Sequence, residues 1–414
     1  MSKIIFERLL LTNGLTVLLH QDKNTPLAVV NILYKVGSRN ENPQRTGFAH
    51  LFEHLMFSGS QNAPEYDSIV EQASGENNAF TNTDFTNYYI NLPATNIETA
   101  LWLEADRMFL LNINEKSLST QRKVVVEEFK QRYLNKPYGD TSLLLRPLIY
   151  TQHPYQWPTI GKDPSHIEQA TLDEVKKFYQ KWYAPNNAIL SIAGNFDVDN
   201  VKKMVVKWFE DIPKQYIQPL SLPKEPFKKS RTFLQVKRDV PASAIYIAFL
   251  MTNRQDPHYY AFDMISDILG NGKSSRLYQE LVVKENIFQD ITCYISGSLD
   301  QGFIIIEGKI HDHYTLEQAE AAIWKVIKKT RNSINQYELS KVKNKYETNY
   351  YSSLVNLMSR AENLAFYEFI GDAELINHEM EKYSNVSLEA IFNIFDSEMI
   401  IDKSIVLYYQ KEKA

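Results

Sequence analysis

The same order of predicted elements occurs twice along the 414-residue chain. Residues 17–32 contain two strand-like runs joined by a turn at a proline, and residues 234–247 repeat this pattern about 215 residues later. An amphipathic helix follows each pair of strands, predicted at 50–57 in the first half and at about 258–269 in the second. A chain of this kind is constrained to fold as two related halves.

Further strands follow each predicted helix, at 78–81 and 86–90 in the first half and at 303–307 in the second. Strands and helices therefore mix within each half, and several of the connections resemble hairpins. The pattern predicts an α+β protein of two duplicated α/β sandwich domains, with mainly antiparallel sheets rather than one parallel sheet.

Prolines at four positions between residues 213 and 226 interrupt both helical and strand periodicity ahead of a Lys228-Lys229 pair. This stretch predicts an interdomain linker at 213–230, between a first domain at 1–212 and a second domain at 231–414. The length of the chain favours two or three domains, and the repeat favours two.

Composition excludes several classes of protein. A net charge of -5 gives no basic surface for nucleic acid, and 44% hydrophobic with 23% charged residues is ordinary for a soluble globular chain. The single Cys293 excludes an intrachain disulfide and a cysteine-based zinc cluster. Glu7 and Arg8 interrupt the apolar run at the N-terminus, and no stretch approaches a membrane span. We expect no membrane segment and a cytoplasmic protein as the sequence is written, or a periplasmic one if a signal peptide was removed.

Two histidines and a glutamate lie within five residues of the first predicted helix, in the order His50-Leu51-Phe52-Glu53-His54. Residues four apart on a helix share a face, with Cβ atoms about 5 to 6 Å apart, so both imidazoles can reach one ion. This is the inverted zinc motif H-x-x-E-H, and a catalytic zinc needs three protein ligands plus a water. Glu53 stands where it can accept a proton from that water, whose pKa zinc lowers to about 7.

The alternative is that the two histidines are ordinary polar residues and that Glu53 is a helix-supporting charge. Residues 47–57 are otherwise apolar, which predicts a buried helix whose three ionisable groups need compensation. A metal ion is the natural partner for two imidazoles and a carboxylate, so the pattern favours Zn²⁺. The matching helix of the second half has no histidine pair, which indicates that only the first half kept a metal.

A third zinc ligand has to come from another part of the chain. The best candidate is Glu128, on a predicted helix from about residue 115 to 133. Four residues recur there at i, i+3, i+4 and i+7 and define one inward face: Gln121, Val124, Val125 and Glu128. The alternative is that Glu127 and Glu128 are both surface charges, and spacing alone leaves the two interpretations open.

These residues resemble those of a known family. The motif at 50–54, followed by Val124-Val125-Val126-Glu127-Glu128, is similar to the pitrilysin family of inverzincin zinc metallopeptidases. Four other stretches match its short two-domain members, among them the mitochondrial processing peptidase subunits: residues 153–161, 183–188, 193–196 and 274–278. The resemblance implies that His50, His54 and Glu128 bind Zn²⁺ and that Glu53 is the general base of an endopeptidase.

The resemblance also implies how a peptide substrate is held. In this family an extended peptide adds to a strand beside the zinc, which matches residues 78–81 here and gives the contacts to Asn78, Ala79 and Phe80. An edge strand offers unpaired backbone groups to any extended chain, which agrees with this role. The alternative is an ordinary sheet strand.

The chain departs from the family in its second half. Active members carry an arginine and a tyrosine there, and the matching positions are Val282 and Gln289, which offer neither a guanidinium nor a phenol. Gln121 likewise stands where a second acidic residue often precedes the zinc glutamate. This departure predicts a heterodimer in which a homologous subunit supplies Arg and Tyr and a clamshell-type chamber forms on dimerisation. A homodimer is the alternative.

The sequence leaves two functions open for the chain. The chain is a zinc endopeptidase if the motif is functional, and a non-catalytic chamber or scaffold subunit of a related complex if it is not. The intact His50, Glu53, His54 and Glu128 argue against a scaffold.

The run His311-Asp312-His313 suggests a second metal site, but the sequence offers it no evident third ligand.

Overall fold

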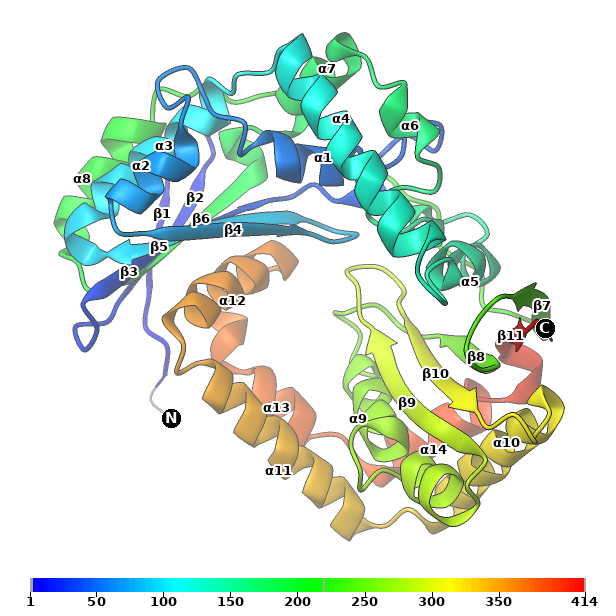
Figure 1. Cartoon of the computed structure of the whole chain (residues 1–414). Coiled ribbons are helices and arrows are strands. Elements are labelled where there is room, and N and C mark those ends of the chain that lie inside the picture. Colours follow the sequence, from blue (N-terminus) through cyan, green and yellow to red (C-terminus); the bar gives the residue numbers. More distant parts are fainter. Residues whose placement is uncertain (1–2, 219, 413–414) are drawn as a thin grey trace. The chain divides into compact units, whose positions relative to one another are not determined.

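The computed structural model describes residues 3–218 and 220–412, so residue 219 of the predicted linker and the extreme ends of the chain lie outside it. By their internal contacts the described residues form two compact units, both drawn in Figure 1. The first unit comprises the residues up to Gln131, Trp157–Leu222 and Tyr351–His378. The second comprises Arg132–Gln156, Pro223–Tyr350 and the residues from Glu379.

A six-stranded sheet forms the centre of the first unit, in the order β1-β2-β6-β3-β5-β4. Its strands are β1 (Glu7–Leu10), β2 (Thr16–Gln21), β3 (Leu27–Tyr34), β4 (Glu76–Thr81), β5 (Thr86–Pro93) and β6 (Ala188–Gly194). β2 and β6 run parallel, and the other neighbouring strands are antiparallel. β4 lies at one edge of this sheet, beside β5.

A five-stranded sheet forms the centre of the second unit, in the order β7-β11-β8-β10-β9. Its strands are β7 (Thr232–Arg238), β8 (Ala244–Leu250), β9 (Phe288–Ser296), β10 (Phe303–Ile310) and β11 (Ile405–Lys411). β7 and β11 run parallel, and the other neighbours are antiparallel.

The two sheets share one topology. The parallel pair β2 and β6 corresponds to β7 and β11, and the antiparallel series β6-β3-β5-β4 corresponds to β11-β8-β10-β9. The helix α1 (Phe48–Leu55) comes between β3 and β4, and α9 (Tyr259–Gly270) comes between β8 and β9, so the two helices hold equivalent places. The predicted duplication, the α+β class and the mainly antiparallel sheets are confirmed.

Helices cover the sheets of both units. The first unit also contains α2 (Tyr66–Gln72), α3 (Ile97–Phe109), α4 (Glu115–Phe129), α6 (Ser165–Glu168), α7 (Leu172–Trp182), α8 (Val198–Phe209) and α12 (Leu357–Ile370). The second also contains α5 (Thr141–Ile149), α10 (Leu316–Ser333), α13 (Glu379–Ser384) and α14 (Leu388–Ser397). The helix α11 (Gln336–Ser353) leads from the second unit into the first. Among the described residues, no helix combines the length and apolarity that a membrane crossing requires.

Each sheet is covered by one helix from the other half of the sequence. α12 packs on β3 and β6 of the first sheet, where Ala361 meets Val29 and Ala193, and Figure 1 shows it on the face opposite α1. α5 packs on β8 and β11 of the second sheet, where Leu145 joins a core cluster with Tyr246. Long-range packing, rather than chain order, therefore completes both sandwiches.

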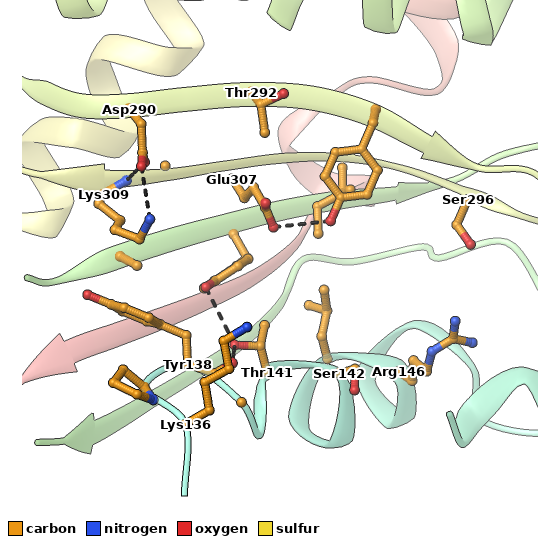
Figure 2. A pocket seen from close by; sticks show the side chains of 18 of the residues that line it. Lys136, Tyr138, Thr141, Ser142, Arg146, Asp290, Thr292, Ser296, Glu307 and Lys309 are labelled. Atoms are coloured by element: carbon orange, nitrogen blue, oxygen red, sulfur yellow. Dashed lines mark hydrogen bonds and ion pairs between the residues drawn. The ribbon is translucent and has the colours of Figure 1, made fainter. Parts of the chain in front are cut away.

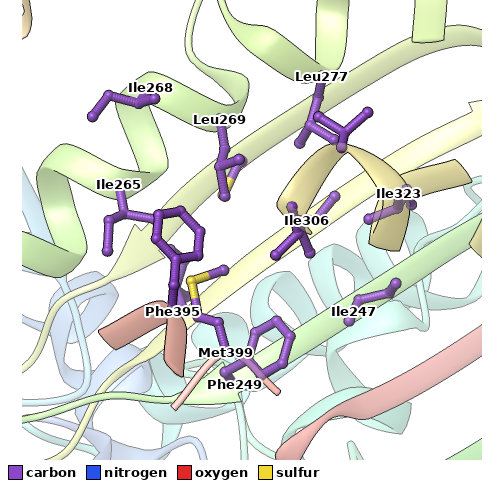
Figure 3. Packing of buried hydrophobic residues seen from close by; sticks show 14 of the residues in the cluster. Ile247, Phe249, Ile265, Ile268, Leu269, Leu277, Ile306, Ile323, Phe395 and Met399 are labelled. Carbon is purple, nitrogen blue, oxygen red and sulfur yellow. The ribbon is translucent and has the colours of Figure 1, made fainter. Parts of the chain in front are cut away.

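The compact units are discontinuous in sequence, unlike the continuous domains predicted at 1–212 and 231–414. The segments 132–156 and 351–378 each join the unit of the other half. The physical reason lies in strands such as β8, which is apolar at every position and must be covered on both faces. Alternate residues of β8 do belong to two core clusters, one with α5 and one with α9, α10 and α14, part of which Figure 3 shows.

A cavity of about 860 Å³ lies in the second unit between α5 and the face of β8, β10 and β9 (Figure 2). Its polar floor is bonded internally. Lys309 Nζ and the Asp290 carboxylate form an ion pair of 2.9 Å, and Tyr294 Oη donates to Glu307 at 3.1 Å. These groups are stabilised by each other, since each finds its hydrogen-bond partner within the protein.

Candidate metal centre

The helix that carries the histidine motif begins at a position that only glycine fits. Gly47 has a φ of 92°, in the left-handed region, and its carbonyl accepts the Leu51 N–H at 2.9 Å to start α1. A Cβ at this position would lie 2.5 Å from the carbonyl oxygen of Ile160. The start of α1 is therefore held against the chain near Ile160, and the helix predicted at 50–57 runs from Phe48 to Leu55.

The side chains of His50, His54 and Glu128 converge where α1 and α4 pack together. Glu128 Oε2 lies 3.7 Å from His50 Nε2 and 3.3 Å from His54 Nε2. The two imidazole rings have centroids 4.9 Å apart and planes at 83° to one another. One ligand atom from each residue lies within 4.8 Å of the other two, and the described part of the chain contains no other group of this kind.

This donor set fits zinc. Imidazole nitrogen and carboxylate oxygen are both ligands of Zn²⁺, and two histidines with one glutamate leave a fourth position open, as catalytic sites do. Mg²⁺ and Ca²⁺ prefer oxygen ligands, which two imidazoles do not provide. The three groups are also partly or largely withdrawn from water, with side chains 11% (His50), 26% (His54) and 17% (Glu128) exposed.

Local sequence fixes the helix that brings Glu128 to this site. The Asn114 side chain caps α4 by accepting the N–H groups of Lys116 and Ser117 at 2.9 and 3.0 Å. Further along α4, Val125 is buried and forms part of the face turned to the core. Glu128 follows Val125 by three residues, so it lies on the border of the same face.

The predicted inward face of α4 is wrong at one residue. Val124 is 44% exposed, whereas Leu118 and Val125 are buried. Successive residues on a helix turn by about 100°, and the buried face is centred on Val125, so Val124 points to solvent. Between the two glutamates that the spacing left open, Glu127 is exposed and Glu128 is the one beside the histidines.

Aromatic side chains hold the other side of α1. Tyr183 and Tyr179 stack on Phe52 with ring centroids 5.0 and 6.1 Å apart. Tyr88 Oη donates to the Phe52 carbonyl oxygen at 3.2 Å. Burial raises the pKa of both Tyr88 and Tyr183, and the negative charge of Glu53 raises each further. Glu53 therefore lies within electrostatic reach of these two phenols, which stay protonated.

The predicted substrate strand is the edge strand β4, which begins two residues earlier than predicted, at Glu76. β4 lies against α1. Asn78 Oδ1 accepts the N–H of Ala79 at 2.8 Å, and Phe80 is 38% exposed. The strand thus presents both backbone and apolar surface close to the helix of the histidine motif.

Models of one peptidase family match most of the chain. The model described as Insulinase (Peptidase family M16) matches residues 16–143, and the model described as Peptidase M16 inactive domain matches residues 169–346. The chain belongs to peptidase family M16.

Relatives of this M16 chain cover nearly its whole length. The zinc protease PqqE of Helicobacter pylori is 29% identical over 395 residues, which are 94% of this chain and 89% of that protein. The crystal structure of a protease from Helicobacter pylori has a TM-score of 0.92 at 28% identity, covering 99% of this chain and 100% of that one. Pitrilysin, at 18% identity and a TM-score of 0.79, shares the fold over 98% of this chain and 45% of its own.

The two second-half positions that depart from the family have local roles in this M16 chain. Val282 packs against the core cluster of the second unit. Gln289 Nε2 donates to the Ile310 carbonyl oxygen at 3.1 Å. In the first unit, Gln121 Nε2 donates to Ser58 Oγ at 3.4 Å, close to the end of α1. Val282 is thus held by apolar packing, Gln289 by a bond to backbone and Gln121 by a bond to a side chain.

The second metal site that the run at 311–313 suggested does not assemble. His311 and His313 stack with ring centroids 5.7 Å apart and planes at 19°. Asp312 pairs with Lys411 Nζ at 3.3 Å. Within the described residues no third ligand joins the two imidazoles, so the site that the sequence left open lacks a metal-binding set.

Sequence reasoning missed a buried ion pair in the first unit of this M16 chain. Arg107 is 1% exposed, and its Nε donates to Glu104 at 2.8 Å. The guanidinium also lies 4.5 Å from the ring centroid of Tyr88, which bonds to α1. An acid and an arginine three residues apart on a helix that is mostly apolar up to residue 103 are the signal that could have revealed the pair.

A second missed group is Glu41, in the loop before α1. Burial raises the pKa of its carboxyl group to about 8, while the N–H donors around it act in the opposite direction. An acidic residue shortly before an apolar helix is a weak signal in sequence alone, because most such residues are solvated.

Proposed function

We propose that this chain is a zinc endopeptidase that hydrolyses peptides or unfolded polypeptide segments. The observation that carries the proposal is the convergence of His50, His54 and Glu128, whose ligand atoms lie within 4.8 Å of one another. The Helicobacter pylori relative is named a zinc protease, which supports the same metal and the same class of reaction.

In this proposal His50, His54 and Glu128 hold Zn²⁺ and Glu53 moves the proton. When bound, zinc supplies a Lewis acid that polarises the scissile carbonyl and lowers the pKa of a water molecule to about 7. Glu53 accepts the proton of the attacking water and returns it to the leaving amine. Glu53, His50 and His54 lie on the same short helix, α1, which keeps the base and two of the ligands at a fixed spacing.

We propose that β4 binds the substrate by strand addition. An edge strand has backbone N–H and C=O groups that point away from its sheet. The Ala79 N–H is already bonded to the Asn78 side chain, which identifies a donor that an incoming peptide can take over. Phe80 offers apolar contact beside it. We expect Ala79→Pro, which deletes this donor, to raise KM more than it lowers kcat, and Asn78→Ala to have a smaller effect on KM.

We propose that a homologous subunit completes the catalyst. Neither Val282 nor Gln289 can place a positive charge or a phenol beside a developing oxyanion. A heterodimer with a subunit carrying Arg and Tyr supplies both, and a homodimer does not. The test is peptide hydrolysis by the purified chain with and without such a subunit. Full activity of the chain alone, unchanged by the partner, contradicts the divided catalyst.

The zinc endopeptidase is tested by zinc content and peptide hydrolysis in the same preparations. We expect about one zinc per wild-type chain by elemental analysis, as a site with one set of three ligands requires. His50→Ala and Glu128→Ala should lose zinc and hydrolysis together. Glu127→Ala is the matched control. It removes the exposed carboxylate next to Glu128 and should leave zinc content and hydrolysis unchanged. Zinc near zero in metal-replete wild-type protein contradicts the proposal and favours the non-catalytic scaffold.

A further inference from the structure

A buried carboxyl group lies at the N-terminal end of the metal-binding helix. Glu41 is 7% exposed and stands six residues before Gly47. Its Oε2 accepts the Gly47 N–H at 2.8 Å, and its Oε1 accepts the Ala49 N–H at 2.9 Å. Trp157 Nε1 donates to Oε2 at 3.1 Å. Both carboxyl oxygens are thus bonded, two bonds going to the first turn of α1.

The groups around this carboxyl are themselves fixed. Trp157 is fully buried. The Thr46 N–H donates to His166 Nδ1 at 3.1 Å, and Gly47 lies tightly against Ile160. The start of α1 therefore cannot slide or rotate without breaking bonds to Glu41 or colliding with the chain near Ile160.

We propose that Glu41 is a positioning residue of the metal centre, which sets the rotation and height of α1 and so the placement of His50 and His54. Ala49 directly precedes His50, so a displacement at the Ala49 N–H passes to the first ligand through a single peptide unit. A functional set has to be held within about 0.5 Å of its working geometry, which a free helix end does not ensure. The inference rests on the proposed function, because a positioning role requires a zinc site.

The second unit offers a matched carboxylate with a similar bonding pattern, and its described residues contain no candidate metal-binding set. Glu225 Oε1 accepts the Thr151 N–H at 2.8 Å, and its Oε2 accepts the N–H groups of Gln152 and His153 at 2.9 and 3.1 Å. Like Glu41, Glu225 is buried and gathers backbone donors of one short segment. Its loss should cost stability alone.

Glutamine is the informative replacement at both positions. A side-chain amide keeps the size of a carboxyl group but has one acceptor oxygen and an NH₂ group that only donates. At position 41 the amide must therefore face N–H donors on one of its two sides. Either Ala49 or Gly47 then loses its acceptor and meets a second donor, whereas Trp157 Nε1 keeps its other acceptor, the Ser38 carbonyl oxygen at 3.1 Å.

The test compares full-length wild type, Glu41→Gln and Glu225→Gln. We measure the zinc dissociation constant by competition with a chromophoric chelator, the thermal midpoint, and kcat and KM with one fluorogenic peptide. Both variants should lower the thermal midpoint. Only Glu41→Gln should weaken zinc binding, by about tenfold, the lower end of the effect of losing a supporting bond around a metal site. Its kcat should fall with KM unchanged.

The outcomes separate this inference from the proposed function. Glu41→Gln that melts earlier but binds zinc as wild type does overturns the positioning role, and so does an equal loss of affinity in Glu225→Gln. If Glu41→Gln does not fold, Glu41→Asp decides, because it keeps the carboxyl group but shortens its reach by one methylene. Its zinc affinity should lie below that of wild type, and wild-type affinity overturns the inference. A wild-type chain that binds no zinc contradicts the proposed function before any variant is compared.

Discussion

The helices α1 and α9 occupy equivalent places in the two units, yet their polar side chains are satisfied in different ways. On α9, Asp263 accepts a hydrogen bond from Tyr383 Oη at 2.6 Å, and Asp267 pairs with Lys345 at 3.1 Å. On α1 the histidines converge instead with Glu128 of α4, in a set that fits a metal ion. The duplicated fold thus accepts polar groups on this helix either by giving them protein partners or by arranging them around an ion.

The largest expected effect is a loss of kcat on replacing Glu53 of α1, which replacement of Asp267 of α9 should not cause. Glu53→Gln should keep zinc and lower kcat by about 10² to 10⁴, the usual contribution of a general base. Asp267→Asn should leave kcat unchanged, because its carboxylate serves a pair within the second unit. Steady-state hydrolysis and zinc content measure both. An active Glu53→Gln protein overturns the mechanism.

The second prediction concerns Asp263, a half-buried acid of α9. Burial raises the pKa of Asp263, and the bond from Tyr383 opposes this. Asp263→Ala removes an acceptor from a buried hydroxyl and should lower the free energy of unfolding by about 1 to 3 kcal/mol. Urea unfolding measures the loss. Zinc content should not change, and a drop in zinc would show that the two helices are not functionally distinct.

Metal removal should act on α1 and its neighbour α4 but not on α9. Without an ion, His50, His54 and Glu128 lose the partner that joins α1 to α4, so local opening becomes easier there. We expect a chelator to speed amide hydrogen exchange in α1 and in the C-terminal turn of α4, measured by mass spectrometry of peptic fragments. Exchange in α9 should stay as it was. Equal acceleration in both helices contradicts the comparison.

The smallest expected effect concerns α12 and α5, the helices that each cover the sheet of the other half. On β2, His20 Nδ1 lies 2.7 Å from the Ile5 carbonyl oxygen, and Arg360 of α12 lies beside the ring and pairs with Asp22. Burial lowers the pKa of His20, and the nearby guanidinium lowers it further. The folded state therefore resists protonation of this ring.

The sign of the resulting pH dependence follows from linkage. Below the ordinary histidine pKa of about 6.5, the unfolded chain binds more protons at this position than the folded one, so stability falls as the pH falls. His20→Gln should reduce the loss of unfolding free energy between pH 7.5 and pH 5.5. A Tyr409→Phe control removes a hydroxyl that holds α5 through Asp140 and should leave that slope unchanged. An unaltered slope in His20→Gln contradicts this assignment.

Periodic and spaced features were predictable because they depend on local geometry. The strands that were predicted and α1 were located to within a few residues, whereas β1, β6, β9 and β11 were not predicted. The four-residue spacing of His50 and His54 placed both on one face before any tertiary contact was known. Glu128 was harder. Spacing could not separate it from Glu127, because an acidic residue on a half-buried helix face becomes a ligand only if a second helix presents histidines to it.

The places of α5 and α12, and the role of Glu41 as an acceptor, were not predictable from local pattern. Which helix covers the second face of a sheet depends on packing between segments far apart in the chain, as α12 on β3 and β6 shows. The acceptor role of Glu41 depends on Gly47 and Trp157 meeting in space, and their 110-residue separation in sequence carries no signal of it.

The sequence by itself determined the duplicated fold class and the motif on α1. The first follows from an order of elements that occurs twice along the chain, and the second from residue spacing along one helix. The tertiary structure brings Glu128, which the family resemblance already implied, beside the two histidines. It alone decided that α5 and α12 each cover the sheet of the other half and that a buried carboxyl bonds the start of α1. The physical reason is that ligation, face coverage and capping by a distant side chain require atoms within a few ångströms of one another, and only the folded chain sets such distances.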